Sequence, residues 1–465
     1  MDYDLFVIGG GSGGVRAARR AAATGAKVGL AEMSKMGGTC VQRGCVPKKL
    51  MVYASEYGPI FEEARRYGWD GVSDACFDWK RFKPKLREEL ERLEEVYRGL
   101  LTGSGVTIHD ARARLTDPHT VEFSTGKTVT AEHILIATGG QPFRPDIPGA
   151  DLGLVSDDMF ELDELPKRLL IIGGGYIACE FASMMNGMGV EVHVYQRTAQ
   201  ILRGFDDEAR GVISEGMRDR GIHFHFGCNV AELRRREDGC IWTMSTEGDE
   251  MVVDQVLFAT GRTPNTNDMG LEDVGVALGE KGEVKVDRYS RSSVPSVWAI
   301  GDVTDRIQLT PVAIREAMAF VRTVFGGVPT AYDHDDVPSA VFTQPEMGNA
   351  GLTEEQARAK GLPLKVFCST LRPMRTSFIG DPERVLLKLV VHGETDRILG
   401  VHLVAPNAGE MIQFAGIAVK AGVTKEVWDS TCAVHPTIAE EIVTMADPVR
   451  TVGIEEDGTG EVDAA

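Results

Sequence analysis

The stretch that decides the fold is Leu5-Phe6-Val7-Ile8-Gly9-Gly10-Gly11-Ser12-Gly13-Gly14-Val15. A short apolar strand runs into a G-x-G-x-x-G pattern and then into a helical segment from Val15 to about Thr24. Glycines in this pattern permit a tight turn and let backbone N–H groups approach a pyrophosphate at the helix N-terminus. The sequence therefore predicts a dinucleotide-binding unit at the start of the chain.

An acidic residue follows this unit where the ribose of a dinucleotide would lie. Glu32 ends the next apolar segment, Lys27 to Ala31, and comes 23 residues after Gly9. A carboxylate at this position accepts hydrogen bonds from a free ribose diol. The alternative is a surface carboxylate after a strand, and the flanking strand and helix favour the ribose contact.

A second strand–turn–helix pattern begins at Leu169 and reads Gly173-Gly174-Gly175-Tyr176-Ile177-Ala178. The residue 23 positions after Gly173 is Gln196, and Arg197 and Arg203 follow it. A carboxylate would repel a 2′-phosphate, whereas guanidinium groups bind one through charge-assisted hydrogen bonds. The second unit is therefore predicted to bind NADPH; ordinary surface charge is the alternative for the two arginines.

A pair of cysteines stands in Gly37-Gly38-Thr39-Cys40-Val41-Gln42-Arg43-Gly44-Cys45-Val46-Pro47-Lys48-Lys49. In a regular helix these two Cα atoms would be over about 8 Å apart, beyond the ~4.4–6.8 Å of a disulfide. We therefore expect an irregular backbone, for which Gly44 supplies the freedom. The two lysines and a possible helix N-terminus favour the reactive thiolate. Buried structural thiols are the alternative to a redox pair, and no metal is expected because no further Cys or His lies nearby.

Composition and charge limit the partners. The 465 residues are 43% apolar and 26% charged, which indicates a globular chain of about three domains. A net charge of −19 argues against nucleic acid and anionic membranes, and means that an anionic substrate needs a local basic patch. The sequence contains no run of about 18 apolar residues, so no transmembrane helix is predicted. Its start shows no cationic leader followed by a cleavage site, so we expect the protein to lie in a reducing cytosol. There a close cysteine pair is more often catalytic than structural.

Two later segments repeat one another. Residues 134–139 and 256–261 are apolar strands that both end in Ala-Thr-Gly, so each nucleotide unit has a Gly-rich start and a similar end. Another apolar strand, over residues 297–302, ends in Asp302. Open α/β sheets place ligand-binding residues at the carboxyl ends of their strands.

After about Val337 the pattern indicates a separate α+β domain with two strands between residues 385 and 404. Within it His435 precedes Thr437 and Glu440. The T-x-x-E pattern predicts a capping box, which is the alternative to a role for Glu440 in holding His435. A lone histidine is usually structural, but this one is a candidate acid–base group.

Two basic residues and one aromatic residue are candidates for substrate contact. Arg16 and Arg19 are three apart and share one face of the first helix, where a solvated face is the alternative. Tyr97 lies on a long amphipathic helix predicted from Lys83 to Leu101.

Taken together, the chain resembles the flavin-dependent disulfide reductases, and glutathione reductases most of all. The resemblance covers residues 4–445 and rests on motifs that occur in order: G-x-G-x-x-G, G-G-T-C-V-x-x-G-C-V-P-K-K, G-G-G-Y-I-A, A-T-G-R, G-D-V, L-T-P-V-A and H-P-T-x-x-E-E. It implies an α/β enzyme with two Rossmann-like domains, for FAD and NADPH, and a C-terminal α+β dimerisation domain. It also implies a cytoplasmic homodimer that reduces glutathione disulfide.

The resemblance divides the chain into five segments. They are 1–150 (FAD-binding, first part), 151–275 (NADPH-binding), 276–336 (FAD-binding, second part), 337–450 (interface) and 451–465 (a disordered acidic tail).

Carried onto matching residues, the resemblance implies a catalytic set. Cys45 would contact the flavin, Cys40 would attack the substrate disulfide, and Lys48 would pair with Glu180 beside the flavin ring. His435, held by Glu440 and donated by the other subunit, would protonate the departing thiolate.

The resemblance also implies the contacts of each ligand. FAD would contact Gly9, Gly11, Ser12, Gly13, Gly14, Glu32, Gly38, Thr39, Thr138, Gly139, Asp302 and Thr310. NADPH would contact Gly173, Gly175, Tyr176, Ile177, Arg197, Arg203, Gly261 and Arg262. The substrate would contact Ser12, Arg16, Arg19 and Tyr97.

One departure bears on the substrate. Met318 stands where many members have an arginine that binds a glutathione carboxylate, so glutathione amide or another small disulfide is an alternative. Trypanothione is cationic, so the positive charges of Arg16 and Arg19 argue against it as the substrate. Dihydrolipoamide dehydrogenases usually have P-S-K after the second cysteine and an acid where this chain has Gln196. A flavin- and NADPH-binding sensor without turnover is the alternative from another class.

Overall fold

The computed structural model describes residues 1–72 and 75–453, which divide into two compact units. The first unit contains Met1–Ala54, Cys76–Gly173 and Val230–His334, and the second contains Ser55–Ala75, Gly174–Asn229 and the chain from Asp335 onward. Its α-helices are α1 (Ser12–Ala22), α2 (Gly38–Gln42), α3 (Cys45–Arg66), α4 (Trp79–Gly103), α5 (Tyr176–Gly187), α6 (Asp207–Asp219), α7 (Thr310–Val324), α8 (Glu354–Ala359), α9 (Met374–Ser377), α10 (Ala408–Ala421) and α11 (Lys425–Asp429).

The main sheet of the first unit has the strand order β3-β2-β1-β6-β5-β4, with β17 beside β6. β1 pairs in parallel with both β2 and β6, with Leu5 opposite Val28 and His133. The strands of this unit are β1 (Tyr3–Ile8), β2 (Val28–Glu32), β3 (Thr107–Asp110), β4 (Ala113–Asp117), β5 (Thr120–Phe123), β6 (Thr128–Ile136), β7 (Gly140–Pro142), β8 (Leu154–Val155), β9 (Arg168–Ile172), β12 (Val230–Arg235), β13 (Ile241–Ser245), β14 (Glu250–Val253), β15 (Gln255–Phe258), β16 (Arg262–Pro264) and β17 (Val297–Ala299).

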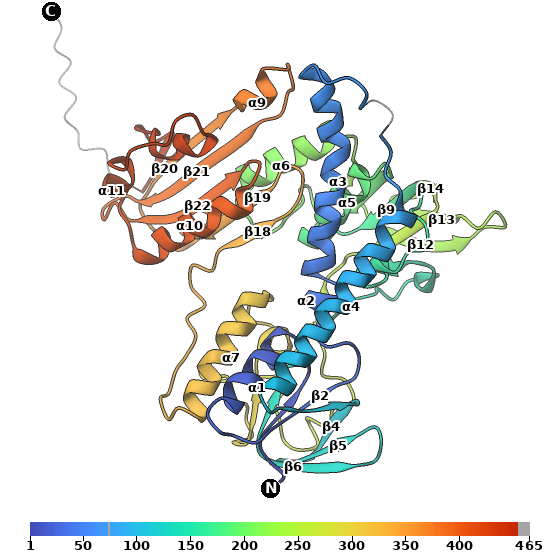
Figure 1. Ribbon diagram of the computed structural model, residues 1–465. Coiled ribbons are helices and arrows are strands. Elements are labelled where there is room, and N and C mark those ends of the chain that lie inside the picture. Colours follow the sequence, from blue (N-terminus) through green and yellow to red (C-terminus); the bar gives the residue numbers. More distant parts are fainter. Residues whose placement is uncertain (73–74, 454–465) are drawn as a thin grey trace, which may run out of the picture. The chain divides into compact units, whose positions relative to one another are not determined.

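Both faces of this sheet are covered, which explains the continuous apolar run of β1. Leu5 and Val7 pack in one core cluster with Phe320 of α7, while Phe6 and Ile8 pack in another with Phe123 of β5. Side chains alternate across a strand, so a strand buried on both faces needs apolar residues at every position. Helices α1 and α7 lie side by side against this sheet (Figure 1). The N-terminus of α1 therefore comes at the carboxyl end of β1.

The second unit contains a parallel pair, β10 (Glu191–Gln196) and β11 (His223–Phe226), and a six-stranded antiparallel sheet. The order of that sheet is β18-β19-β22-β21-β20-β23. Its strands are β18 (Ser339–Val341), β19 (Met347–Gly351), β20 (Leu364–Leu371), β21 (Val385–His392), β22 (Ile398–Val404) and β23 (Arg450–Val452). Ile412, Ala415 and Val419 of α10 pack with the buried residues of this sheet, so an α+β layer forms as predicted.

Two predicted boundaries change. The strand expected over residues 297–302 stops at Ala299, and Gly301–Thr304 forms a 3₁₀ turn because Gly301 has a φ of +74°. Thr451 and Val452, placed in the tail by the sequence, pair with Lys365 and Leu364 as part of β23. The predicted tail from residue 454 onward lies outside the described residues. Along the described chain, no helix is both long and apolar enough to cross a bilayer.

Candidate active site

The first glycine-rich loop has the shape that a pyrophosphate requires. Gly9 has a φ of +112°, and a Cβ there would lie 2.3 Å from the carbonyl oxygen of Ala137. A Cβ on Gly14 would lie 2.0 Å from the carbonyl oxygen of Gly9, so α1 approaches β1 too closely for a side chain. At Gly11 the nearest atom to such a Cβ is Gly38 Cα at 4.0 Å, which leaves open space beside the helix N-terminus. Anions bind at such helix termini, so the residues fit the phosphates of FAD.

Glu32 lies at the end of β2 and faces this loop. Its Oε2 accepts a hydrogen bond from Gly10 N at 2.7 Å, and its Oε1 accepts one from Ser34 N at 2.8 Å. A carboxylate has about four acceptor sites, so both oxygens keep capacity for the hydroxyls of a ribose. The predicted geometry of an acid beside the loop is present.

Asp302 occupies the 3₁₀ turn that follows β17. Burial raises the pKa of its carboxyl, and the positive charge of Arg262 opposes this rise. The turn is held by Glu316 of α7, whose Oε2 accepts from Gly301 N at 2.7 Å. Glu316 is buried and its Oε1 is paired with Arg306 at 2.9 Å and with His334 at 2.7 Å. The sequence analysis missed this support, although a glutamate in an otherwise apolar helix turn was a visible signal.

Two further residues predicted for FAD lie in the same unit. Thr138 Oγ1 donates to the carbonyl oxygen of Asn265 at 2.8 Å, so its hydroxyl holds the neighbouring loop. Gly139, which follows, has a φ of +69°. Arg262, predicted for NADPH, donates from its guanidinium to the carbonyl oxygen of Gly140 and lies 3.9 Å from a carboxylate oxygen of Asp157.

The cysteine pair stands where one helix ends and another begins. α2 ends at Gln42, Arg43 has a φ of −151°, and α3 starts at Cys45, so the backbone is irregular as predicted. The role of Gly44 differs from the prediction: its φ is not in the left-handed region. A Cβ there would lie 2.7 Å from the carbonyl oxygen of Thr39, so the close approach of two backbone segments requires glycine.

The two thiols act as one unit. A hydrogen bond with Cys45, burial, and the negative charge of Cys45 raise the pKa of Cys40 far above its usual value, and hydroxyls of Thr310 and Ser12 partly offset this. The neighbouring thiol, rather than the two lysines, therefore has the largest effect on the pKa of Cys40, and the thiolate that the lysines would favour stays a prediction for the pair. Cys45 is the first residue of α3, where the helix dipole favours negative charge. The first thiolate of the pair therefore belongs at Cys45, with the remaining proton on Cys40.

Thr310 lies closer to the sulfurs than the sequence analysis foresaw. It is the first residue of α7, and its Oγ1 lies 3.7 Å from Cys45 Sγ. The sequence assigned it to FAD, and the structure adds a hydroxyl contact with both thiols. No sequence signal could have given this contact, because 265 residues separate Thr310 from Cys45.

The predicted substrate residues gather around Cys40. Burial and the charge of Cys40 raise the pKa of Tyr97, and Arg16, Ser12 and Arg19 lower it, so all these groups are neighbours. Arg19 Nε is buried and makes no hydrogen bond within the described residues. A guanidinium group near Tyr97, which itself neighbours Cys40, is the kind of group that an anionic disulfide would bind.

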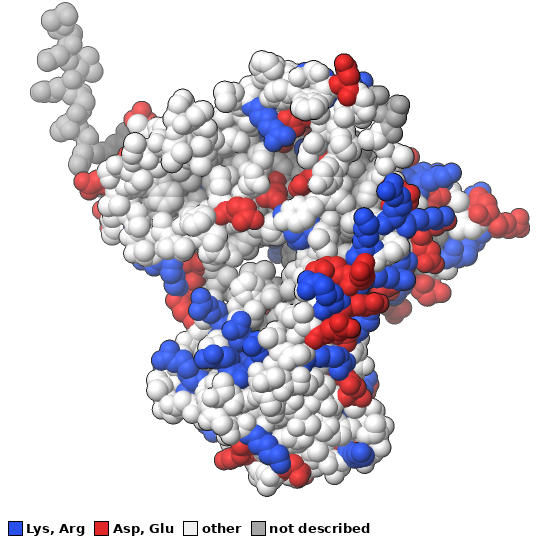
Figure 2. All heavy atoms as spheres, in the orientation of Figure 1, with Lys and Arg blue, Asp and Glu red and all other residues white. Residues whose placement is uncertain are grey.

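Basic side chains gather over α1 and α7 in a protein that is acidic overall (Figure 2). The exposed arginines of these two helices are Arg16, Arg20, Arg315 and Arg322. Met318, on the same α7, is partly exposed and supplies no charge. The local basic patch that an anionic substrate needs is therefore present in the first unit.

The second glycine-rich loop repeats the first. Gly173 has a φ of +121°, and a Cβ there would lie 2.4 Å from the carbonyl oxygen of Ala259. A Cβ on Gly175 would meet nothing within 4 Å, so space remains beside the N-terminus of α5, which starts with Tyr176 and Ile177. Gly261, at the end of the matching Ala-Thr-Gly segment, has a φ of +130°. Within the first unit, Gly173 and Gly261 therefore have the left-handed backbone that a dinucleotide-binding loop requires, and the binding of NADPH by this loop stays a prediction.

Arg197 and Arg203 follow β10 and are both exposed. Neither guanidinium forms an ion pair within residues 1–72 and 75–453, so both are available for a phosphate. Gln196, in place of an acid, donates from Nε2 to Thr198 Oγ1 at 2.7 Å and to the carbonyl oxygen of Gln200 at 3.2 Å. The side chain thus shapes the loop that carries the two arginines.

His435 and Glu440 pair within the second unit. Glu440 Oε2 and Oε1 lie 2.9 and 3.1 Å from His435 Nδ1, and the His435 side chain is 80% exposed. Thr437 Oγ1 accepts from Glu440 N at 3.1 Å, so half of the predicted capping box forms. In a full capping box the Glu440 carboxylate would accept a hydrogen bond from the backbone N–H of Thr437. Here this carboxylate binds His435 instead.

The remaining catalytic candidates, Lys48 and Glu180, belong to different units of the structure. Lys48 lies in the first turn of α3, in the first unit. Glu180 is buried in α5 of the second unit, and its Oε1 accepts from Phe342 N at 2.9 Å. Their expected pairing stays a prediction.

Comparison with known proteins decides the family. The profile of the pyridine nucleotide-disulphide oxidoreductases matches residues 3–317, and the profile of their dimerisation domain matches residues 337–446. The chain belongs to the pyridine nucleotide-disulphide oxidoreductase family. The predicted α/β fold class and disulfide oxidoreductase chemistry are thereby confirmed, with FAD and NADPH as cofactors.

The relatives of this oxidoreductase include proteins named for glutathione. The chain is 49% identical to a glutathione reductase of Burkholderia cepacia over 96% of this chain and 98% of the relative. It is 44% identical to a chloroplastic/mitochondrial glutathione reductase of Pisum sativum over 100% of this chain and 86% of the relative. A trypanothione reductase of Leishmania donovani is 37% identical over 96% of each chain.

Proposed function

We propose that this oxidoreductase is an NADPH-dependent reductase of glutathione disulfide that works as a homodimer. The observation that carries the proposal is the group formed by Cys40, Cys45, Arg16, Arg19 and Tyr97. It combines a coupled dithiol with positive charge, which is the chemistry that an anionic disulfide requires. The similarity to glutathione reductases over nearly the full chain supports the same substrate.

FAD, held along Gly9, Glu32 and Asp302, would supply the two-electron chemistry that links NADPH to the Cys40–Cys45 disulfide. The Cys40 thiolate then attacks one sulfur of the substrate disulfide, and the first thiol leaves with a proton. Cys45 attacks Cys40 Sγ in the resulting mixed disulfide, which releases the second thiol and closes the Cys40–Cys45 bond. One disulfide is reduced to two thiols as the dithiol is oxidised.

The proton on Cys40 requires a base. Because Cys45 holds the pKa of Cys40 high, the attacking thiol is not ionised unaided. We assign the base to His435, held by Glu440 and donated by the partner subunit. Its 80% exposed side chain is open to such a partner, and the family has a dimerisation domain over residues 337–446. The same imidazole then protonates the departing thiolate.

The cofactor contacts and segment boundaries belong to the same proposal. FAD lies along the first loop, Glu32, Asp302 and Thr310, and Lys48 pairs with Glu180 beside the flavin ring. NADPH lies along the second loop, with its 2′-phosphate on Arg197 and Arg203. The segments are 1–150 and 276–336 for FAD, 151–275 for NADPH and 337–450 for the interface, to which Thr451 and Val452 are added because they pair within β23.

We also propose a reducing cytosol as the compartment. The close pair formed by Cys40 and Cys45 suits such a compartment, because there neighbouring cysteines are more often catalytic than structural. A plastid or mitochondrion is the alternative, since one relative is named for these organelles.

One steady-state experiment tests the proposal. NADPH and NADH are each assayed with glutathione disulfide, glutathione amide disulfide, trypanothione disulfide and lipoamide. We expect NADPH with glutathione disulfide to give the highest kcat/KM. A higher kcat/KM with glutathione amide disulfide would identify the amide-capped form as the substrate, consistent with the uncharged Met318. A yellow protein that oxidises NADPH with none of the four would refute the proposal.

A further inference from the structure

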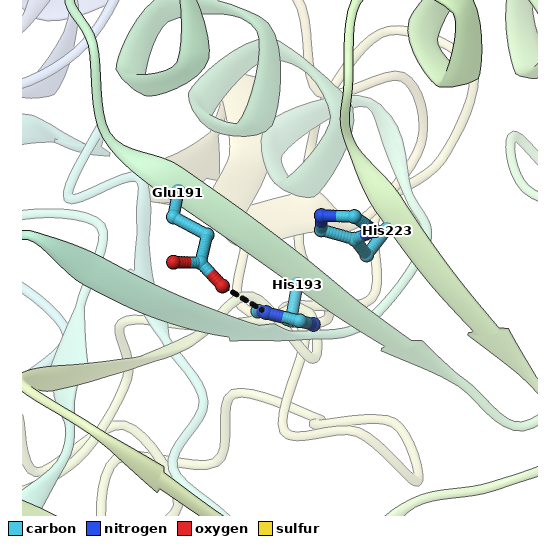
Figure 3. A group of neighbouring side chains, drawn as sticks. All are labelled: Glu191, His193 and His223. Atoms are coloured by element: carbon cyan, nitrogen blue, oxygen red, sulfur yellow. Dashed lines mark hydrogen bonds and ion pairs between the residues drawn. The ribbon is translucent and has the colours of Figure 1, made fainter.

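Two histidines and a glutamate lie close together on two neighbouring strands of the second unit, one of which leads to Arg197. Glu191 and His193 are on β10, and His223 is on the neighbouring strand β11 (Figure 3). Residues two apart on a strand point to the same face, and the parallel register sets His193 opposite His223. One ligand atom from each of the three residues lies within 4.8 Å of the others.

We propose that Glu191, His193 and His223 form a binding site for a divalent transition-metal ion of the Zn²⁺ class. Their donors are two imidazole nitrogens and one carboxylate oxygen, a set that suits Zn²⁺, Ni²⁺ or Cu²⁺ rather than Mg²⁺ or Ca²⁺. Three protein ligands leave a fourth position for water or another exogenous ligand. This site has no part in the proposed disulfide reduction.

The distances are close to those of a metal site. Two ligand atoms at about 2.1 Å from a tetrahedral ion are about 3.4 Å apart. Glu191 Oε1 and His193 Nε2 are already 3.1 Å apart, and the rings of His193 and His223 are stacked with centroids 4.7 Å apart. Glu191 and His223 are exposed, so their side chains can rotate to bring the donors, which now lie within 4.8 Å of one another, onto a common ion.

A fourth residue supports the orientation of His193. His225 Nε2 lies 3.1 Å from His193 Nδ1, on the side of the ring opposite Glu191. Metal-binding histidines usually engage their second ring nitrogen in a hydrogen bond, which fixes the tautomer. With a metal on Nε2, His193 Nδ1–H donates to His225 Nε2, and the proton that Nε2 shared with Glu191 passes to solvent. The metal-free hydrogen bonds therefore already orient the ring for the ion.

The sequence analysis expected no metal and did not find this site. Glu191 and His193 are separated from His223 and His225 by about 30 residues, and only the parallel pairing of β10 and β11 brings them together. An H-x-H beside an E-x-H pattern on neighbouring strands is the signal that could have indicated it.

The test is isothermal titration of the oxidised holoenzyme with Zn²⁺ alone, after N-ethylmaleimide has blocked accessible thiols. We expect one ion per chain, and at least a tenfold weaker dissociation constant in His193→Asn and His223→Asn, with about tenfold weakening in His225→Asn. His392→Asn, a partly exposed histidine outside the group, should bind as the unmodified protein does.

The variants should keep their NADPH oxidation rate in EDTA buffer, which shows that they are folded. The proposal is overturned if the protein binds no stoichiometric Zn²⁺. It is also overturned if His193→Asn and His223→Asn bind Zn²⁺ as tightly as His392→Asn does. Glu191→Gln, at an exposed position, provides an independent ligand removal should either histidine variant fold poorly.

Discussion

Glu440 holds His435 through both carboxylate oxygens, at 2.9 and 3.1 Å from Nδ1, while Thr437 caps the Glu440 backbone. This contact fixes the proton on Nδ1 and leaves Nε2 free to exchange a proton with a thiol. Since the carboxylate orients the ring, we propose Glu440 as a positioning residue and His435 as the acid–base group.

Replacing His435 should lower kcat without loss of either cofactor. His435→Gln should cost about 10²–10⁴-fold in kcat with glutathione disulfide, and Glu440→Gln should cost less and shift the pH profile of kcat. NADPH reduction of the flavin, followed by stopped-flow absorbance, should be unchanged. The control is Glu441→Gln, which neighbours Glu440 but accepts from Thr444. Equal losses in Glu440→Gln and Glu441→Gln would argue against a specific pair.

Removing the attacking sulfur should separate the two half-reactions. Cys40→Ser should bind FAD and abolish disulfide turnover, because no thiolate can form the mixed disulfide. Visible absorbance measures the flavin and NADPH oxidation measures turnover. Cys76→Ser, at an exposed cysteine, is the control and should be fully active. Substantial turnover in Cys40→Ser would remove Cys40 from the attacking role.

The sequence predicted the parts of the site that local pattern encodes. The two glycine loops, Glu32 and the helix start at Cys45 follow from neighbours in the chain, and the structure contains each. The coupling of Cys40 to Thr310 could not be predicted, because it depends on how α7 packs on α1. The same packing depends on Phe320 and the sheet core rather than on any motif. The high pKa of Cys40 likewise arises from its hydrogen bond with Cys45 and from burial, neither of which composition reports.

Reversing one charge beside the dithiol should affect the substrate more than the cofactor. Arg19→Glu should raise KM for glutathione disulfide much more than KM for NADPH, because the partly buried Arg19 lies near Tyr97, which in turn neighbours Cys40. Arg81→Glu, at an exposed arginine of α4 outside the basic patch, is the control and should have a small effect. Arg19→Met tests the loss of charge without repulsion. Equal changes in both KM values would place Arg19 outside the substrate site.

Selection of the phosphorylated nicotinamide should depend on two exposed arginines. Replacing Arg197 and Arg203 together with alanine should reduce the preference for NADPH by several kcal/mol, since a hydrogen bond to a charged group contributes about 1.5–3 kcal/mol. The measurement is the ratio of kcat/KM for NADPH and NADH. Arg235→Ala, an exposed arginine on β12, should leave this ratio unchanged. A parent enzyme that already prefers NADH would contradict the phosphate assignment.

A buried lysine, Lys388, joins separate parts of the second unit. Its Nζ lies 2.8 Å from Asp206, 2.7 Å from Glu208 and 2.8 Å from Glu354, and its side chain is fully buried. Arg450 of β23 contacts Glu208 and Glu354 as well. Burial alone would raise the pKa of Glu354, but hydrogen bonds from Arg450, Lys388 and Arg358 outweigh it and lower the pKa. The network therefore connects the start of α6 with the β-sheet of the same unit.

Lys388→Met should destabilise the protein by about 3–5 kcal/mol near neutral pH, because it leaves buried carboxylates without their cation. Glu208 and Glu354 have pKa values below those of the unfolded chain, so they stabilise the fold above the unfolded value of about 4.3 and lose this effect as the pH falls through their folded values. In the Lys388→Met variant the pKa values of Glu208 and Glu354 should rise. The difference in unfolding free energy between the variant and the parent protein should therefore become smaller as the pH falls. Thermal unfolding of the holoenzyme at pH 7 and pH 4 measures both effects, with Lys360→Met, an exposed lysine, as the control. Two results would show that the network does not stabilise the fold in this way. One is an equal fall in melting temperature in the two lysine variants, and the other is a stability difference between Lys388→Met and the parent protein that is larger at pH 4 than at pH 7.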